Sequence, residues 1–201
     1  MRFAAIETST EWCSVALSLD GEIVGAERKA GNRHSELALP MLDKLFSSSN
    51  IDIGELDAIA FGAGPGSFTG LRIACGLAQG LALARGLPVL GVPTLEALAE
   101  EAGAPRVVAC LDARMGEVYY AALEKQAGRW REAVPLQCVA PDAARPVDDV
   151  HDLEPRRRRE RQVEVEAAAV VVPPGGIARG ERPEAAGIRA VMITGDHPLT
   201  A

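Results

Sequence analysis

Glycine is concentrated in one short stretch, Gly62-Ala63-Gly64-Pro65-Gly66-Ser67-Phe68-Thr69-Gly70, between an expected strand and an expected helix. Glycines there allow a tight turn and leave backbone N–H groups directed outward at the start of the helix, which is a common way to bind an anion. The stretch does not match the GxxxxGK[ST] pattern of the P-loop. Two interpretations remain open. One is an anion site that includes Gly66 and Ser67, and the other is a turn in which Ser67 or Thr69 caps the helix.

Histidines and cysteines are few and are not spaced as metal ligands. The three histidines are His34, His151 and His197, and no two of them are four residues apart on one helix. We therefore expect no metal site and no peptidase activity. His34 is expected to be a partly exposed residue at a helix start, with an interface role as the alternative. The four cysteines also lack metal-type spacing and are interpreted as reduced thiols of a cytoplasmic protein.

Two expected helices carry unusual residues. The helix over 35–47 has more apolar residues than one core-facing stripe of about 100° requires. In the helix that ends near Arg85, Gly76 and Gly80 lie on the same face, although each glycine costs up to ~1 kcal/mol relative to alanine in a helix interior. Close approach of another helix would account for this cost. The partner helix belongs either to the same domain or to another protein.

The remaining pattern predicts an α/β protein that contains a mixed sheet with helices on its faces. Asp20-Gly21 is typical of a hairpin turn, so the chain is expected to open with three antiparallel strands. Thr94 is a candidate N-cap. A second set of strands follows and suggests a duplicated fold. The expected strands are 3–8, 12–19, 22–28, 57–62, 88–92, 106–112 and 117–124, and the expected helices are 35–47, a long helix to Arg85, and 95–102.

Composition excludes several classes of protein. The chain has 201 residues, of which 48% are hydrophobic and 4% aromatic, with a net charge of −7. A core of ordinary size is expected, whereas a base-stacking nucleic-acid binder is not, because stacking needs exposed rings and a negative body repels phosphates. No uncharged apolar run approaches the length of a membrane span, so no membrane contact is expected.

The amino-acid composition changes after about residue 140. No aromatic residue follows Trp130, and residues 140–162 are rich in proline and charge. We expect a domain over 1–104, the start of a second over 105–140, and a poorly ordered tail over 141–201. The basic run Arg156–Arg159 is interpreted as a solvated linker, with tRNA phosphates as the alternative ligand.

Several motifs taken together resemble the TsaB family: GPGSFTGLRI, DARMGEVYYA, the opening AIETSTEWCSVAL, and HSELALPMLDKLF. The resemblance covers residues 1 to about 140. It implies an actin-like ATPase (ASKHA, ribonuclease H-like) fold with a complete first half and a truncated second half.

The resemblance also implies a function. It indicates a non-catalytic scaffold subunit that binds TsaD, with TsaE in the larger complex. TsaD then transfers threonylcarbamoyl to N6 of the adenosine beside the tRNA anticodon, and tRNA is met only through the complex. No catalytic residue and no cofactor are expected. The resemblance implies a helix interface for TsaD, or for a second copy of the chain, with Leu37, Met41, Leu45, Gly76 and Gly80 as its candidate residues.

An enzymatic alternative stays open, although one departure from the family pattern weakens it. Glu7 stands where the family more often has aspartate, the residue that helps to hold a metal nucleotide in kinases of the wider fold. An independent ASKHA-type kinase or ATPase would use Thr8, Ser9, Gly66 and Ser67 for its nucleotide. Asp112-Ala113-Arg114 also lies where the wider fold places a phosphate loop. The structural alternative is a strand end after Glu7 and a surface salt bridge between Asp112 and Arg114.

The last residues show a different resemblance. Residues 185–201 resemble a P-type ATPase segment, in which Thr194, Gly195 and Asp196 match its TGD. The chain has no DKTGT motif, so pump activity is not expected. We attribute this segment to a gene fusion, a frameshift or an assembly error.

Overall fold

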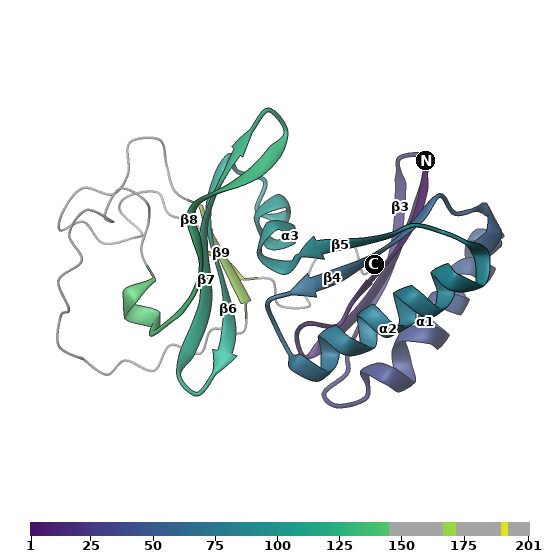
Figure 1. Cartoon of the computed structure of the whole chain (residues 1–201), viewed down its shortest axis with the longest axis horizontal. Coiled ribbons are helices and arrows are strands. Elements are labelled where there is room, and N and C mark those ends of the chain that lie inside the picture. Colours follow the sequence, from purple (N-terminus) through teal and green to yellow (C-terminus); the bar gives the residue numbers. More distant parts are fainter. Residues whose placement is uncertain (145–166, 172–189, 193–201) are drawn as a thin grey trace. The chain divides into compact units, whose positions relative to one another are not determined.

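The computed structural model describes residues 1–144, 167–171 and 190–192. The chain forms two compact units, the first running from Met1 to Thr94 and the second beginning at Leu95 (Figure 1). The expectations for the tail, including Arg156–Arg159 and the match over 185–201, fall almost entirely outside the described residues.

The first unit is built on a five-stranded mixed sheet with the order β3-β2-β1-β4-β5. β1 pairs antiparallel with β2 and parallel with β4, and β5 is parallel to β4. Asp20 and Gly21 both have positive φ, 54° and 103°, as the predicted Asp-Gly hairpin turn requires. The strands are β1 (Arg2–Glu7), β2 (Trp12–Leu19), β3 (Glu22–Lys29), β4 (Ala58–Gly64) and β5 (Val89–Pro93).

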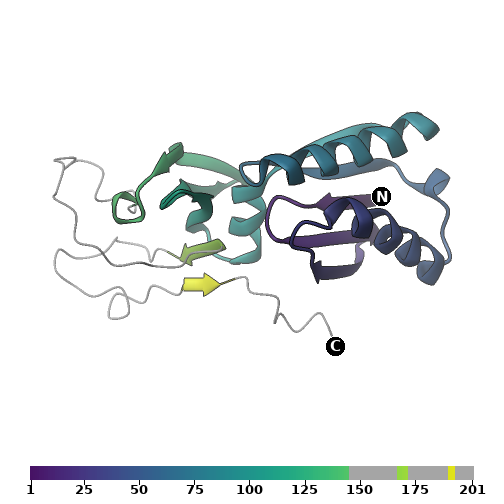
Figure 2. The same cartoon turned by 90° about the horizontal axis from the view of Figure 1, so that it is seen from below.

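Helices α1 (His34–Ser49) and α2 (Phe68–Arg85) lie on the same side of this sheet (Figures 1 and 2). The strands alternate, so that Ala4 and Ile6 face the helices and join the core. From α2 the core receives mainly small side chains at four-residue spacing, which lets this helix come close to the sheet. These side chains are Ala74, Ala78 and Ala82. A short helix, η1 (Ile53–Glu55), precedes β4.

The second unit is a sheet with the order β10-β9-β6-β7-β8, and all of its described pairings are antiparallel. Leu95, Leu98 and Ala99 of α3 pack in one core cluster with side chains from β6 and β7. The elements are α3 (Thr94–Glu101), β6 (Arg106–Arg114), β7 (Glu117–Gln126), β8 (Arg129–Val139), η2 (Pro141–Ala143), β9 (Ala167–Val171) and β10 (Ala190–Met192).

The mixed α/β class and the βββαβαβα order predicted from the sequence are both observed. The predicted capping role of Thr94 is wrong. Thr94 is the first residue of α3, and its buried hydroxyl has no hydrogen-bond partner within the part of the chain that the structure describes. Strand β8 was not predicted, because charged residues and Pro135 interrupt its alternation. A proline is tolerated there since β8 is the last strand in the order of its sheet.

A charged pair fastens α3 to the β7–β8 hairpin. The Glu100 carboxylate accepts hydrogen bonds from Lys125 Nζ at 2.6 Å and from Trp130 Nε1 at 2.8 Å. The hydrogen bond from Lys125, followed by that from Trp130, lowers the pKa of Glu100 below its usual value of 4.5. A carboxyl group with a lowered pKa in the folded state stabilises the fold above its usual pKa, and this contribution is lost as the pH falls through the folded value.

We expect Glu100→Gln to lower the melting temperature by roughly 1–3 °C at pH 7, since exposed pairs of this kind contribute about 0.2–1 kcal/mol. The difference from the wild type should shrink as the pH falls below about 4.5. Thermal melts of both proteins between pH 3 and 7 measure this, with Glu132→Gln on β8 as the control. A loss that is the same at every pH would contradict the role given to the Glu100 charge.

Candidate functional site

The glycine-rich stretch lies where the parallel strands β1 and β4 end, at the same edge of the first sheet. The loop after β4 is bonded directly to the loop after β1. The backbone N–H of Ser67 donates to the carbonyl oxygen of Ser9 at 2.6 Å, and Thr8 Oγ1 donates to the carbonyl oxygen of Gly70 at 2.7 Å. The structure therefore brings together all four residues considered for nucleotide binding: Thr8, Ser9, Gly66 and Ser67.

Three glycines lie at this contact because a larger residue would not fit there, and they do not line an open cavity. A Cβ at Gly66 would lie 2.6 Å from both the Cβ and the carbonyl oxygen of Ser9. A Cβ at Gly70 would overlap the carbonyl oxygen of Thr8, and one at Gly62 would overlap the carboxylate of Glu7. The space beside each glycine is therefore already filled by Glu7, the last residue of β1, or by the residues that follow it.

Most polar side chains at this junction form hydrogen bonds within the chain. Glu7 Oε1 accepts from the backbone N–H of Ser9 at 2.5 Å, and Ser67 Oγ accepts from the N–H of Gly70 at 3.3 Å as the N-cap of α2. Thr8 is fully buried and Ser9 is 2% exposed. Among the described residues, Ser9 Oγ has no hydrogen-bond partner. Of the two interpretations drawn from the sequence, the geometry favours the capped turn with Ser67 as the cap.

His34 is buried, contrary to the expectation of a partly exposed residue. It is 6% exposed, and its Nε2 lies 2.9 Å from the carbonyl oxygen of Thr10. This hydrogen bond joins the start of α1 to the loop after β1. No local sequence pattern indicates this burial, because it arises when that loop folds over the first turn of a helix more than twenty residues later.

The second candidate site is the outward face of α2. A Cβ at Gly76 or Gly80 would meet no atom within 4 Å, so both glycines face open space. Phe68 and Leu83 lie near the two ends of this face and are 73% and 86% exposed. The Arg72 guanidinium lies 3.2 Å from the centroid of the Phe68 ring. We name this surface, formed by Phe68, Arg72, Gly76, Gly80 and Leu83, the α2 face.

The three candidates on α1 lie differently. Met41 and Leu45 are 8% and 9% exposed and belong to the core beneath the helix, and Leu37 is half-buried against it. The apolar surplus on α1 is therefore largely used inside the first unit. Sequence reasoning missed Phe68, Arg72 and Leu83. The available signal was their spacing from Gly76 or Gly80, which is about one helical turn for Arg72 and Leu83 and about two turns for Phe68.

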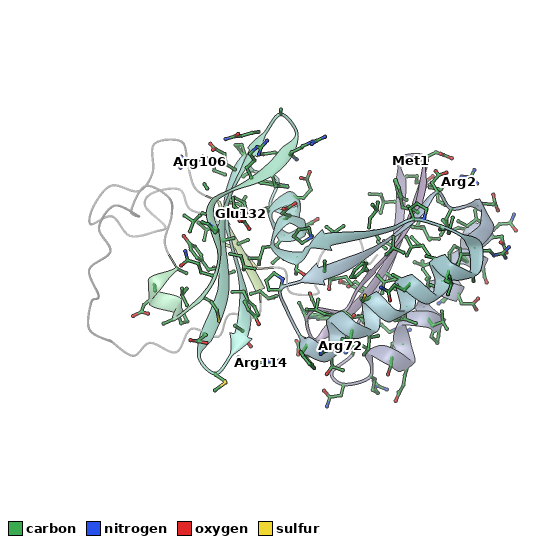
Figure 3. All side chains as sticks on the ribbon, viewed as in Figure 1. Met1, Arg2, Arg72, Arg106, Arg114 and Glu132 are labelled. Atoms are coloured by element: carbon green, nitrogen blue, oxygen red, sulfur yellow. The ribbon has the colours of Figure 1, made fainter. Side chains whose placement is uncertain are left out.

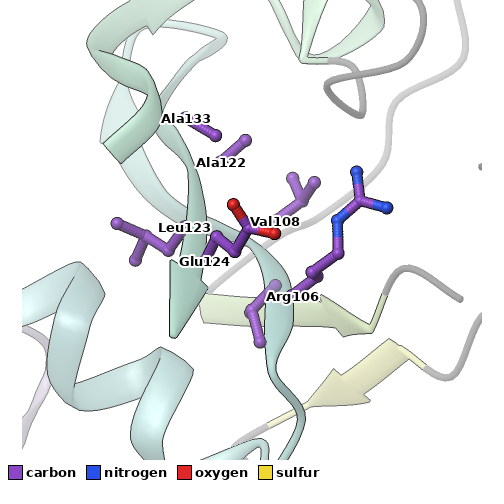
Figure 4. Close-up of a pocket in the computed structure, with 7 residues that line it drawn as sticks. Arg106, Val108, Ala122, Leu123, Glu124 and Ala133 are labelled. Carbon is purple, nitrogen blue, oxygen red and sulfur yellow. The ribbon is translucent and has the colours of Figure 1, made fainter. Parts of the chain in front are cut away.

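Clusters of metal-binding side chains and pockets are the remaining candidates among the described residues. They contain no group of three or more His, Cys, Asp or Glu side chains that could hold a metal ion. A pocket of about 40 Å³ lies in the second unit between β6, β7 and β8, beside Arg106, Leu123 and Glu124 (Figure 4). It has room for a few water molecules and not for a nucleotide. No helix among the described residues is long and apolar enough to cross a membrane.

The mixed sheet of the first unit and the βββαβαβα order define the class of protein: an α/β protein with the actin-like ATPase (ASKHA) fold, as predicted. Residues 27–165 match the family model "TsaD: tRNA N6-adenosine threonylcarbamoyltransferase". The chain is 43% identical to the solved structure of YeaZ from Pseudomonas aeruginosa, with a TM-score of 0.66, over 70% of this chain and 68% of that one.

Curated relatives agree with the structural match. The chain is 41% identical to the tRNA threonylcarbamoyladenosine biosynthesis protein TsaB of Haemophilus influenzae, over 70% of this chain and 64% of that protein. It is 46% identical to TsaB of Escherichia coli, over 65% of this chain and 58% of that protein. The chain belongs to the TsaB family, which confirms the resemblance found in the sequence. It spans about 58–64% of the length of these two relatives.

Two alanine substitutions in α2 test the packing of the junction. Gly70→Ala is expected to destabilise the fold by about 1–3 kcal/mol, because its Cβ overlaps the backbone of Thr8. Gly76→Ala, the matched control on the same helix, has open space and should stabilise the fold by about 0.5–1 kcal/mol. Urea unfolding of the three proteins measures both changes. Equal effects of the two substitutions would show that the loops are not in close contact.

Proposed function

We propose that this chain is a non-catalytic scaffold subunit in the synthesis of threonylcarbamoyladenosine in tRNA. It binds a TsaD protein, which transfers the threonylcarbamoyl group to N6 of the adenosine beside the anticodon. TsaE joins the larger complex, and tRNA is reached only through it. The names of the TsaB relatives support the pathway. The exposed α2 face is the observation that carries the scaffold role. The cytoplasmic location and the division into domains at residues 104 and 140 stay predictions.

The α2 face has the properties of a helix-docking surface. Its two glycines lower the surface at the middle of the helix, so that a partner backbone can come close. Phe68 and Leu83 are fifteen residues apart, which is about 22 Å along a helix, and their exposed apolar side chains border the glycine notch on both sides. These two exposed side chains lie on the same helix face as the notch and are available to a helix that crosses it. A TsaD helix crossing at Gly76 and Gly80 would cover both anchors.

Met41 and Leu45, the buried candidates on α1, contribute to the α2 face only by holding α2 in place. Met41 and Leu45 share one core with Ala74 and Ala78 of α2, so they hold the two helices in a common layer. Leu37, which is half-buried, and Leu39, which is 46% exposed, are the α1 side chains available to a partner. When TsaD is absent, a second copy of the chain would occupy the same face.

The internal hydrogen bonds and close contacts of the residues at the β1–β4 junction support a non-catalytic role. A kinase or ATPase needs room and free donors for phosphates where β1 and β4 end. Here Thr8, Ser67 and the Glu7 carboxylate are bonded within the chain, and Gly66 and Gly70 are in contact with Ser9 and Thr8. The independent kinase or ATPase is therefore the less favoured function.

Nucleotide titration separates the two functions. We expect the isolated protein to show no saturable binding of Mg-ATP up to about 1 mM in isothermal titration calorimetry, because the space for phosphates is filled. A scaffold needs no nucleotide of its own, whereas an enzyme must bind its nucleotide alone. Stoichiometric binding with a micromolar dissociation constant would favour the kinase or ATPase.

Gly80→Leu tests the docking surface. The new side chain projects into open space, so the melting temperature should stay within about 2 °C of the wild type while binding to purified TsaD weakens at least tenfold. Ala97→Leu, an equivalent change at an exposed position on α3, is the control and should bind normally. If Gly80→Leu melts normally and still binds TsaD, the α2 face is not the interface. If the wild-type protein does not bind TsaD, the proposed function is wrong.

A further inference from the structure

Strand β3 forms a long and regular edge of the first sheet. It is eight residues long, contains no proline, and pairs with β2 without a register shift. Among the described strands, β2 is its one neighbour. An edge strand presents a row of unpaired N–H and C=O groups, to which a strand of another chain can add.

The other edge strands of the described sheets are short or interrupted. β5 has five residues and ends at Pro93, and β10 has three residues. β8 contains Pro135 and has two register shifts against β7. Proline, bulges and short length are ordinary means of preventing a further strand from adding to an edge. β3 differs from the other edges in having none of them.

The pairing with β2 determines which backbone groups of β3 point outward. Glu22 pairs with Leu19 across the two-residue turn, and the pair that closes such a turn is hydrogen-bonded. Hydrogen-bonded pairs alternate along an antiparallel ladder, so every second residue from Glu22 bonds to β2. The N–H and C=O groups of Ile23, Gly25 and Glu27 therefore point toward the open edge.

The hairpin that carries this edge is fixed at its turn. Arg2 Nε donates to Asp20 Oδ2 in the turn at 3.1 Å, and Arg2 Nη1 donates to Glu55 Oε2 of η1 at 2.7 Å. Arg2 is labelled in Figure 3. Because the edge is already formed in the single chain, addition of a strand loses less conformational entropy than pairing of two unstructured segments.

The side chains of β3 on the helix-covered face are complementary to themselves. Val24 pairs with the core residue Leu17, so Glu22, Val24, Ala26 and Arg28 alternate onto the face that α1 covers. This row begins with an acid, ends with a base and has two apolar residues between them. Glu22 and Arg28 are both exposed, and neither forms an ion pair with another described residue.

We propose that β3 pairs antiparallel with β3 of a second copy of the chain, about a two-fold axis that passes through Gly25. In this register Glu22 of each copy lies opposite Arg28 of the other, and Val24 lies opposite Ala26. A shift of two residues in one direction would place Arg28 opposite Val24, and a shift in the other would place Glu22 opposite Ala26. Either shift separates the charges, so the charge pattern selects one register and identifies a second copy as the partner.

The β3 pairing goes beyond the proposed function and does not rest on it. It uses the edge of the first sheet, whereas the surface proposed for TsaD lies on α2. A dimer through β3 therefore needs no residue of the α2 face, and the two surfaces can be tested separately.

Charge reversal on β3 tests this pairing. Analytical ultracentrifugation of the full chain, from about 1 to 500 µM, should show a concentration-dependent dimer, because one strand pairing gives a small interface. Glu22→Arg or Arg28→Glu places like charges opposite each other twice, so each should raise the dissociation constant roughly fivefold or more. Both side chains are exposed, so melting temperatures should change by less than about 2 °C. The double variant Glu22→Arg/Arg28→Glu restores opposite charges and should dimerise like the wild type.

Two further variants serve as controls. Arg131→Glu makes the same change at an exposed position of the edge strand β8, and Gly80→Leu alters the α2 face, so both should dimerise normally. A wild type that stays monomeric over the whole range would overturn the β3 pairing, as would a double variant that dimerises no better than the single ones. A dimer lost in Gly80→Leu and unchanged by the β3 variants would place the interface on α2. These outcomes leave TsaD binding, which is measured separately, unaffected.

Discussion

The contact between the backbone of Thr8 and that of Gly70 determines much of the first unit. Thr8 follows β1, Gly70 lies in the first turn of α2, and the Thr8 hydroxyl donates to the Gly70 carbonyl oxygen at 2.7 Å. Only a residue without a Cβ fits at this distance. The contact sets where α2 begins and how it lies on the sheet. It also fills the place where related folds would bind phosphates. The proposed function is therefore binding of a partner on the surface and not binding of a nucleotide in a cavity.

Small residues on α2 serve two opposite purposes. Ala74, Ala78 and Ala82 are buried and let the helix lie close to the sheet. Gly76 and Gly80 are exposed and leave a notch in the outward face. One face is therefore shaped by the protein's own core, while the other has a shape that the described core does not require. A docking surface gives a reason for the exposed glycines, since their cost in helix propensity brings no packing gain within the first unit.

The second unit shows the same separation between internal packing and exposed shape. One face of its sheet is covered by α3, which Glu100 fastens to Lys125 and Trp130. At the β6–β7 turn, Met115 and Gly116 are left-handed, as a two-residue hairpin turn favours, and the Met115 side chain is fully exposed.

The sequence alone determined the order of elements through β7, the Asp-Gly hairpin and the TsaB resemblance, because turn residues, alternation and helical periodicity act locally. It also placed Gly76 and Gly80 on one helix face, since spacing along a helix needs no tertiary information. Only the tertiary structure decided which way that face points, that Met41 and Leu45 belong to the core, and that His34 is buried. It also showed that Gly66 and Gly70 are in contact with Ser9 and Thr8 instead of lining an open loop. These outcomes depend on contacts between residues far apart in the chain, which local patterns do not encode.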